Sequence, residues 1–299
     1  MVEYKLITMA FKIENNKLLD INFWKKINPD FHIDEKDFII SQKPINFQLD
    51  EIESAYSDLL EEGYLQKDPV EWNLPIPRMA EAVRQFTDFG WPTVFVFVYD
   101  EFFLLPYKLS GILNKILGKD FMLLPDFWAW YVDPLKAEKG WAPHRDKGID
   151  SLTEDRKPKS FTLWIPLTDV STKNGCINVI PANWDPYFIN PENNNTKFDP
   201  QNIRALPAKA GSVLGWNQAI LHWGGRSSKK AANPRISVAF ELQRNDVSPF
   251  NNPLFSSIPL PNLNFRLKLI GKQILQYKHM YPITEEMKNI AEVLTNIAL

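Results

Sequence analysis

The sequence predicts a mainly β fold with flanking helices: a double-stranded β-helix, of the jelly-roll or cupin-like type, braced by N- and C-terminal α-helices. Two observations support this prediction. Apolar residues recur at helical spacing within residues 1–120 and again within 246–299, whereas residues 121–245 hold short apolar runs separated by polar segments. Many short strands between helical flanks favour packed sheets with helices outside them.

The chain is interpreted as one elaborated domain. Its 299 residues can bury a single large core, and no repeat or linker divides them. Within residues 1–299 we expect a helical N-terminal part with an added strand at 1–120, a jelly-roll core at 121–245 and a C-terminal helical tail at 246–299.

Helices and one strand are expected in the N-terminal part. Two apolar stripes have helical spacing: Ile52, Ala55, Tyr56, Leu59 and Leu60, and then Met79, Ala82, Val83 and Phe86. A short helix is expected at 110–118. The apolar run at 94–99 predicts a β-strand, because acidic residues interrupt the apolar stretch well short of the ~20 residues that a membrane helix needs.

Six strands are expected in the core, and two helices after it. The strands are residues 127–132, 161–167, 177–180, 212–216, 219–223 and 235–243, and the helices are 265–277 and 285–298. Two long polar segments, 147–159 and 183–202, interrupt the strands. Such segments are either a lid over a site or plain surface insertions.

A possible metal site lies in the core. His144 and Asp146 are two residues apart, so in a strand they point to the same face, and His222 can complete a set of three ligands. Two imidazoles and one carboxylate leave other positions on a divalent ion open, which is typical of a catalytic metal. A second His-x-Asp pair, His32 and Asp34, lies among charged residues and is interpreted as a solvated helix start.

An anion site is predicted thirteen residues after His222. Arg235 and Ser237 share one face of an apolar strand, which places a guanidinium and a hydroxyl together. A buried arginine needs an anion, and its planar fork matches a carboxylate. The combination of a metal and this anion site favours a dicarboxylate ligand.

Residues 121–245 resemble the phytanoyl-CoA dioxygenase family of iron(II)/2-oxoglutarate oxygenases. The shared stretches besides the motifs above are Phe161–Asp169, Asn174–Pro181 and Ala210–Leu214. The resemblance implies that His144, Asp146 and His222 bind Fe(II). It also implies that Arg235, helped by Ser237, holds the distal carboxylate of 2-oxoglutarate, and that the strand with Thr162 and Trp164 touches this co-substrate.

The resemblance further implies a reaction with O2 in which a C–H bond of a small organic molecule is hydroxylated and succinate and CO2 are released. Because related halogenases lack the carboxylate, Asp146 favours hydroxylation. Trp128, Trp130, Tyr131 and Trp184 are candidate substrate-binding residues, although alternation places Tyr131 on the face opposite the first two, and the sequence does not decide which face lines the site.

Two other functions stay open from the sequence. A jelly-roll metalloenzyme that does not use 2-oxoglutarate, such as a cupin-type dioxygenase or isomerase, would not require Arg235. A non-catalytic binding protein on the same fold would hold no active metal. The intact set of ligands argues against the latter.

The composition of the chain limits the kinds of partner that we expect it to bind. A formal charge of −2 gives no basic surface for nucleic acid, and no segment has the length of a membrane span. One cysteine, Cys176, permits no internal disulfide, and the first ten residues lack a basic start before an apolar run. We therefore expect a cytoplasmic protein that acts on a small molecule, and nothing indicates its oligomeric state.

Overall fold

Two antiparallel sheets form the centre of the computed structural model, which describes residues 17–190, 195–281 and 283–298. The larger sheet has the strand order β1-β6-β3-β8-β2-β9 and the smaller one the order β5-β4-β7. The strands are β1 (Tyr64–Lys67), β2 (Met122–Val132), β3 (Ser160–Pro166), β4 (Ile177–Ile180), β5 (Arg204–Leu206), β6 (Val213–Asn217), β7 (Leu221–Gly224), β8 (Arg235–Gln243) and β9 (Phe255–Ser256).

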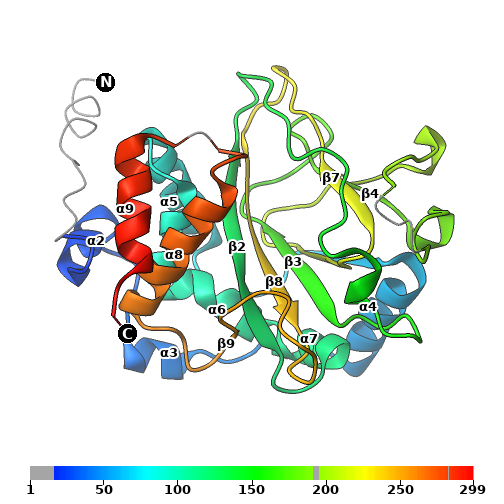
Figure 1. Ribbon diagram of the computed structural model, residues 1–299, viewed down its shortest axis with the longest axis horizontal. Coiled ribbons are helices and arrows are strands. Elements are labelled where there is room, and N and C mark those ends of the chain that lie inside the picture. The colour runs from blue at the N-terminus through cyan, green and yellow to red at the C-terminus, as the bar shows by residue number, and fades with distance from the viewer. Residues whose placement is uncertain (1–16, 191–194, 282, 299) are drawn as a thin grey trace.

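The predicted fold class of antiparallel sheets with flanking helices is confirmed. Figure 1 shows a layer of helices on one side of the larger sheet and the smaller sheet, with β4 and β7, on the other side. Within the described residues the strands form two separate sheets and do not close into one continuous barrel. The space between the sheets is where a site can lie.

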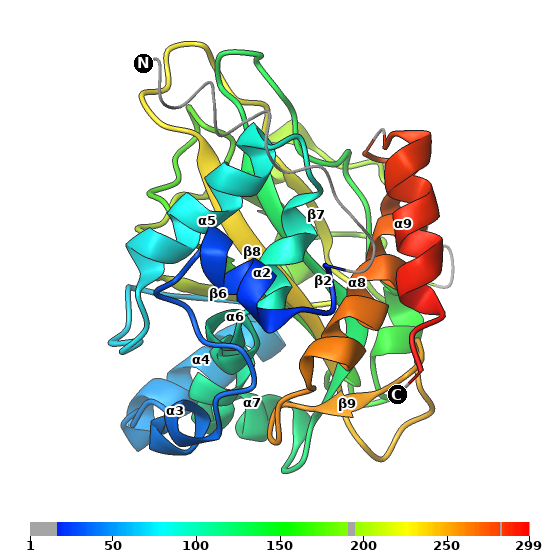
Figure 2. The same cartoon turned by 90° about the vertical axis from the view of Figure 1, so that its left-hand side faces the viewer.

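The helices form on amphipathic segments, as predicted. They are α2 (Ile21–Ile27), α3 (Lys36–Ser41), α4 (Leu49–Glu62), α5 (Ile76–Asp88), α6 (Asp100–Lys108), α7 (Ser110–Leu117), α8 (Leu263–Tyr277) and α9 (Glu285–Thr295). Helix α4 begins with a capping box between Gln48 and Glu51 and ends at Gly63, whose φ of 84° suits glycine. In Figure 2, α2, α5, α8 and α9 lie over the larger sheet.

The strand expected at 94–99 is wrong. Thr93–Val98 forms a 3-10 helix, and its residues from Val94 to Val98 are 0% exposed. The hydroxyl of Thr93 donates a hydrogen bond to the carbonyl of Ala129 in β2. A run that is buried on every side shows no periodicity, so its sequence does not distinguish a strand from a helical segment.

The strand of the N-terminal part is β1, which pairs with β6 from Tyr64 opposite Trp216 to Lys67 opposite Val213. Helix α4 and Gly63 directly precede it. This pairing attaches the N-terminal helices to the edge of the larger sheet.

The central strand β8 separates the core from the site. It pairs with both β2 and β3. Ile236, Val238 and Phe240 point to the main apolar core on the helix side, and the residues between them point to the smaller sheet. One strand therefore supports the core with one face and the cavity with the other.

His32 and Asp34 precede α3, as predicted, but they are only partly exposed and have partners in the protein. His32 Nδ1 lies 2.6 Å from an oxygen of buried Glu101. The backbone N–H of Asp34 donates to Asp100, which forms a 2.5 Å ion pair with Arg266. This pair of residues thus belongs to a structural network. None of the described helices is long and apolar enough to span a membrane.

Candidate metal centre and its cavity

The structure brings together the three predicted metal ligands. His144 and His222, the latter in β7, exchange two backbone hydrogen bonds of 3.0 Å. Candidate ligand atoms of His144, Asp146 and His222 lie within 4.8 Å of one another. No other such group of three occurs within 17–190, 195–281 and 283–298.

Both imidazoles are oriented by backbone carbonyls. His144 Nδ1 lies 2.8 Å from the carbonyl oxygen of Ala142, and His222 Nδ1 lies 3.2 Å from that of Ile220. Because a carbonyl only accepts hydrogen bonds, each Nδ1 carries the proton and each Nε2 is left with its lone pair. The two Nε2 atoms are therefore the atoms available to bind a metal ion.

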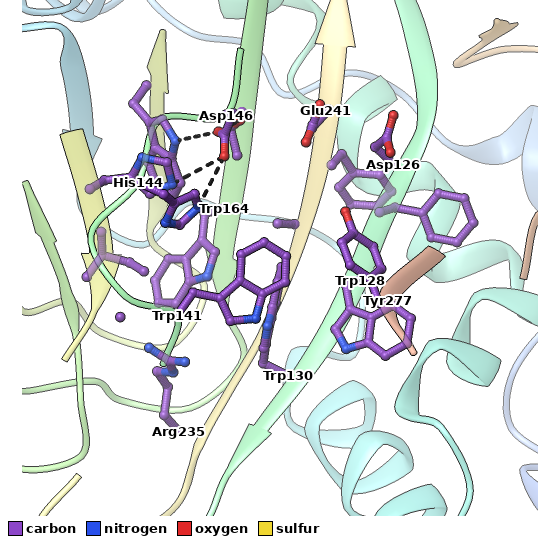
Figure 3. Close-up of a pocket in the computed structure, with 18 residues that line it drawn as sticks. Asp126, Trp128, Trp130, Trp141, His144, Asp146, Trp164, Arg235, Glu241 and Tyr277 are labelled. Atoms are coloured by element: carbon purple, nitrogen blue, oxygen red, sulfur yellow. Dashed lines mark hydrogen bonds and ion pairs between the residues drawn. The ribbon is translucent and has the colours of Figure 1, made fainter. Parts of the chain in front are cut away.

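Asp146 uses its two oxygens differently. Oδ2 accepts a hydrogen bond of 2.7 Å from the Thr162 hydroxyl and one of 3.2 Å from the Trp216 indole N–H. Oδ1 lies 3.4 Å from Nε2 of His144 and 3.5 Å from Nε2 of His222. The hydrogen bonds hold the carboxylate so that Oδ1 faces the two imidazoles (Figure 3). Thr162 thus orients a ligand, a contact that the sequence did not predict.

Burial and mutual charge set the protonation of the three side chains. Burial is the largest single effect on the pKa of each side chain. It lowers the pKa of His222 to about 4. For Asp146 the opposing effect of the two histidines is larger in sum, and its pKa lies well below the usual range. At His144, the hydrogen bond and negative charge of Asp146 together outweigh the effect of burial, so the pKa of His144 is raised. A carboxylate and a neutral His222 are present at neutral pH, as metal binding requires.

These donors fit a divalent transition metal. Two imidazole nitrogens and one carboxylate oxygen are the facial set typical of non-haem iron(II), and each ligand has the outer hydrogen bond that usually fixes a metal ligand.

Arg235 begins β8 and lies in the same cavity, where it is 3% exposed. Its Nη1 donates a 2.5 Å hydrogen bond to the carbonyl of Gly175, whereas its Nε has no partner. No carboxylate pairs with it among the described residues, and burial lowers its pKa to about 10. A buried guanidinium with no acid partner is ready for an anionic ligand.

Gly224 makes room for this guanidinium. A Cβ at Gly224 would come within 2.8 Å of Arg235 Nη1 and 2.9 Å of the Gly140 Cα. Gly224 follows His222 by two residues, so the end of β7 provides both a metal ligand and space for Arg235.

Ser237 is buried on the Arg235 face of β8, where its register partner on β2 is Trp130. Its hydroxyl has no partner among the described residues. Because Ser237 stands outside the set that lines the cavity, direct help for Arg235 stays a prediction.

The cavity is lined by one face of β2. Trp128 and Trp130 line it, and so does Trp164 of β3. Tyr131 points the other way and lines a second cavity with Trp91 and Met287. Trp184 is 46% exposed, with the Arg204 guanidinium 4.9 Å from its ring centroid. The structure therefore does not bring Tyr131 and Trp184 into the cavity: Tyr131 is on the other face of β2 because side chains alternate, and Trp184 ends the exposed 3-10 helix Ala182–Trp184.

The two polar segments meet beside the site. Leu152 and Phe188 form a small apolar cluster with Ala219. Arg145, between the two ligands of the His-x-Asp motif, forms a 2.6 Å ion pair with Asp185. Both segments are thus anchored to the strands at these points; residues 191–194 lie outside the described part of the chain.

Sequence reasoning missed a second polar end of the cavity. Asp126, Glu241 and Tyr277 line it, and Lys147 forms a 2.8 Å ion pair with Glu241. Burial, with the charges of Asp126 and Asp146 adding to it and Lys147 opposing it, raises the pKa of Glu241 to about 7. The two-residue period of β8 would have placed Glu241 on the face of Arg235. No local pattern indicates Asp126 or Tyr277.

Comparison with known proteins supports the predicted family resemblance. The family model described as phytanoyl-CoA dioxygenase matches residues 92–233. No curated protein matches the sequence.

Solved structures share the fold at low sequence identity. The non-heme monooxygenase ThoJ in its apo form has a TM-score of 0.54 at 12% identity, covering 81% of this chain and 98% of its own. The non-heme alpha ketoglutarate dependent carbocyclase SnoK from nogalamycin biosynthesis has a TM-score of 0.50 at 16% identity, covering 72% and 99%. Apo HygX from Streptomyces hygroscopicus has a TM-score of 0.50 at 14% identity, covering 67% and 90%.

At these identities the likeness shows the fold alone. Together with the family match at residues 92–233, it confirms the predicted double-stranded β-helix and the resemblance of this chain to the phytanoyl-CoA dioxygenase family.

Proposed function

We propose that this protein is a non-haem iron(II)- and 2-oxoglutarate-dependent oxygenase that hydroxylates a small organic molecule. The observation that carries the proposal is Arg235: a buried guanidinium, with no acid partner among the described residues, in the same cavity as His144, Asp146 and His222. A metalloenzyme that binds no organic acid has no use for this arrangement, because burying an unpaired charge is costly.

2-Oxoglutarate can bind the metal ion and Arg235 at the same time. It is a dicarboxylate whose keto acid end can chelate a metal, and its far carboxylate can form a bidentate pair with Arg235. The room that Gly224 leaves beside Nη1 of Arg235 permits this approach.

The iron, its co-substrate and O2 would supply the oxidising chemistry that replaces a C–H bond by C–OH, with one oxygen atom of O2 in the hydroxyl and the other in the released succinate, beside CO2. The chain holds and orients the reactants. His144, Asp146 and His222 bind the ion, while Thr162 and Trp216 fix the carboxylate of Asp146. The indole rings of Trp130, Trp141 and Trp164 line the cavity and exclude water.

The third ligand favours hydroxylation over halogenation, because Asp146 occupies the position that a halide would need. We place the activity in the cytoplasm, where the single cysteine, Cys176, stays a buried thiol.

An anaerobic titration tests the proposal. Iron(II) followed by 2-oxoglutarate should produce the weak visible charge-transfer band of the chelate, and admission of O2 with a substrate should yield succinate. A protein that binds iron without any spectral response to 2-oxoglutarate would instead be a jelly-roll metalloenzyme of another kind.

A further inference from the structure

The polar end of the cavity holds two carboxylates with unequal surroundings. Asp126 is 3% exposed, and its oxygens accept hydrogen bonds from the amides of Gln276 (2.5 Å) and Asn251 (2.7 Å). Glu241, whose side chain is 15% exposed, has the ammonium of Lys147 at 2.8 Å. One carboxylate therefore has neutral partners, and the other has a cation.

Asp126 has no cation in direct contact among the described residues. Lys147 pairs with Glu241, whereas Lys272, whose charge acts on Asp126, donates its hydrogen bonds to Asn251 and to the carbonyl of Asn252. A ligand with a positive charge would supply the direct cation partner that Asp126 lacks.

Aromatic rings enclose the same space. Tyr277, from the end of α8, lies with its ring centroid 5.3 Å from that of Trp128 and 5.4 Å from that of Trp141. Figure 3 shows Tyr277 beside Trp128, on the side of the cavity where Asp126 and Glu241 lie, with Arg235 at the other side. Aromatic faces next to carboxylates bind organic ammonium groups better than they bind neutral groups.

Trp128 gives independent evidence for a ligand. It is 4% exposed and lines the cavity, yet its indole N–H has no hydrogen-bond partner among the described residues. A buried donor without a partner costs free energy, which a ligand that carries an acceptor atom would recover.

We propose that this end of the cavity binds the prime substrate through a protonated nitrogen, so that the substrate is an organic amine with one net positive charge and a hydrogen-bond acceptor for Trp128. The proposal rests on the proposed function. Glu241 pairs across the sheet with Thr162, which donates to Asp146. The ammonium would thus sit one strand from a metal ligand, and the oxidised carbon would lie on the metal side of the nitrogen.

Three ring compounds of equal size test the charge preference: benzylammonium, benzyl alcohol and benzoate. Their binding is measured by tryptophan fluorescence on the manganese-loaded enzyme with saturating 2-oxoglutarate, so that Arg235 is occupied. Benzylammonium should bind at least about tenfold more tightly than benzyl alcohol, and benzoate should bind most weakly. Equal affinities for the three compounds would overturn the proposal without any variant.

Glu241→Gln removes the charge and keeps the shape. It should abolish most of the preference for benzylammonium over benzyl alcohol, whereas Glu62→Gln, at an ion pair with Arg204 outside the cavity, should leave the preference unchanged. A preference that Glu241→Gln leaves intact would refute the role of Glu241. If Glu241→Gln does not fold, Asp126→Asn takes its place with the same two outcomes.

The amine proposal can fail separately from the proposed function. The comparison of benzylammonium with benzyl alcohol is repeated on the metal-free protein. If neither the metal-free nor the manganese-loaded protein prefers benzylammonium over benzyl alcohol, and 2-oxoglutarate binds normally, only the amine proposal is overturned. Absence of 2-oxoglutarate binding, with the preference kept, overturns the proposed oxygenase and leaves the ammonium site supported.

Discussion

The two ends of the cavity differ in charge and in how their charges are satisfied. At one end, Arg235 is a buried cation without an acid partner among the described residues. At the other end, Asp126 is a buried acid with amide partners, and Glu241 is a half-buried acid with an ammonium partner. Arg235 and Glu241 lie on the same face of β8, six residues and about 20 Å apart along the strand. The difference shows how a two-residue period lets one strand present a cation and an acid at opposite ends of one cavity.

The ends also differ in the elements that build them. The Arg235 end comes from β8 and from the end of β7, where Gly224 lies. The Glu241 end needs Tyr277 of α8 and the amides of Gln276 and Asn251. The sheets alone therefore build the Arg235 end of the cavity, and the C-terminal tail completes the Glu241 end.

Removing a proposed metal ligand should have the largest effect, because the proposed ion lies between the two ends of the cavity. His222→Ala should lower iron affinity by more than about 100-fold, since even outer-sphere changes at metal ligands cost 10–100-fold. Equilibrium dialysis with iron(II) measures this. His279→Ala, at an exposed histidine outside the cavity, is the control and should bind iron normally. Normal iron binding by His222→Ala would place the metal elsewhere.

Arg235→Ala tests the anion end. The Kd for 2-oxoglutarate should rise about 30-fold or more, because a lost charge-assisted pair in a buried site costs on the order of 2–5 kcal/mol, while iron binding stays nearly intact. Arg235→Lys should recover little, because an ammonium cannot form the bidentate pair. Anaerobic titration measures both, with Arg204→Lys as control. Wild-type affinity in both Arg235 variants would contradict the assignment.

Thr162→Val tests how the ion is held between the ends. It removes the 2.7 Å hydrogen bond to Asp146 Oδ2 and leaves the bond from Trp216. Metal affinity should fall about 10-fold, and Thr162→Ser should restore it because serine keeps the hydroxyl. If both variants lost 2-oxoglutarate affinity at unchanged metal affinity, Thr162 would contact the co-substrate instead.

The smallest effect is expected in the pH dependence of the acidic end. Because burial raises the Glu241 pKa from 4.5 to about 7, folding favours the protonated acid, and this stabilisation is lost as the pH rises through about 7. Glu241→Gln stays neutral. Its free energy of unfolding relative to the wild-type protein should increase between pH 4.5 and pH 8 by on the order of 1–3 kcal/mol. Urea unfolding of the ligand-free proteins measures this; a difference independent of pH would contradict it.

Much of the fold follows from the sequence where apolar runs have clear ends. The strands expected at 177–180 and 235–243 appear with those bounds as β4 and β8. The three strands that were missed, β1, β5 and β9, all lie at the edges of their sheets. Short edge strands bury few residues and leave a weak pattern, whereas the buried segment at 93–98 has an apolar pattern that fits two structures.

The sequence predicts those residues of the candidate site that lie close together along the chain. His144 and Asp146, and Arg235 and Ser237, each share a face because they are two residues apart. Asp126 follows an irregular pairing within β2, and Tyr277 arrives from α8 through tertiary packing. Such contacts between distant segments have no local signal, so the acidic end required the structure.

A crystal structure of the protein with manganese and 2-oxoglutarate would show both parts of the proposed site at once. We expect one ion at ~2.0–2.2 Å from Nε2 of His144, Nε2 of His222 and Oδ1 of Asp146, as these ligand types bind divalent metals. We also expect the far carboxylate of 2-oxoglutarate on the guanidinium of Arg235. An ion bound away from these three atoms, or a 2-oxoglutarate molecule that leaves Arg235 without a carboxylate, would show that the proposed site is wrong.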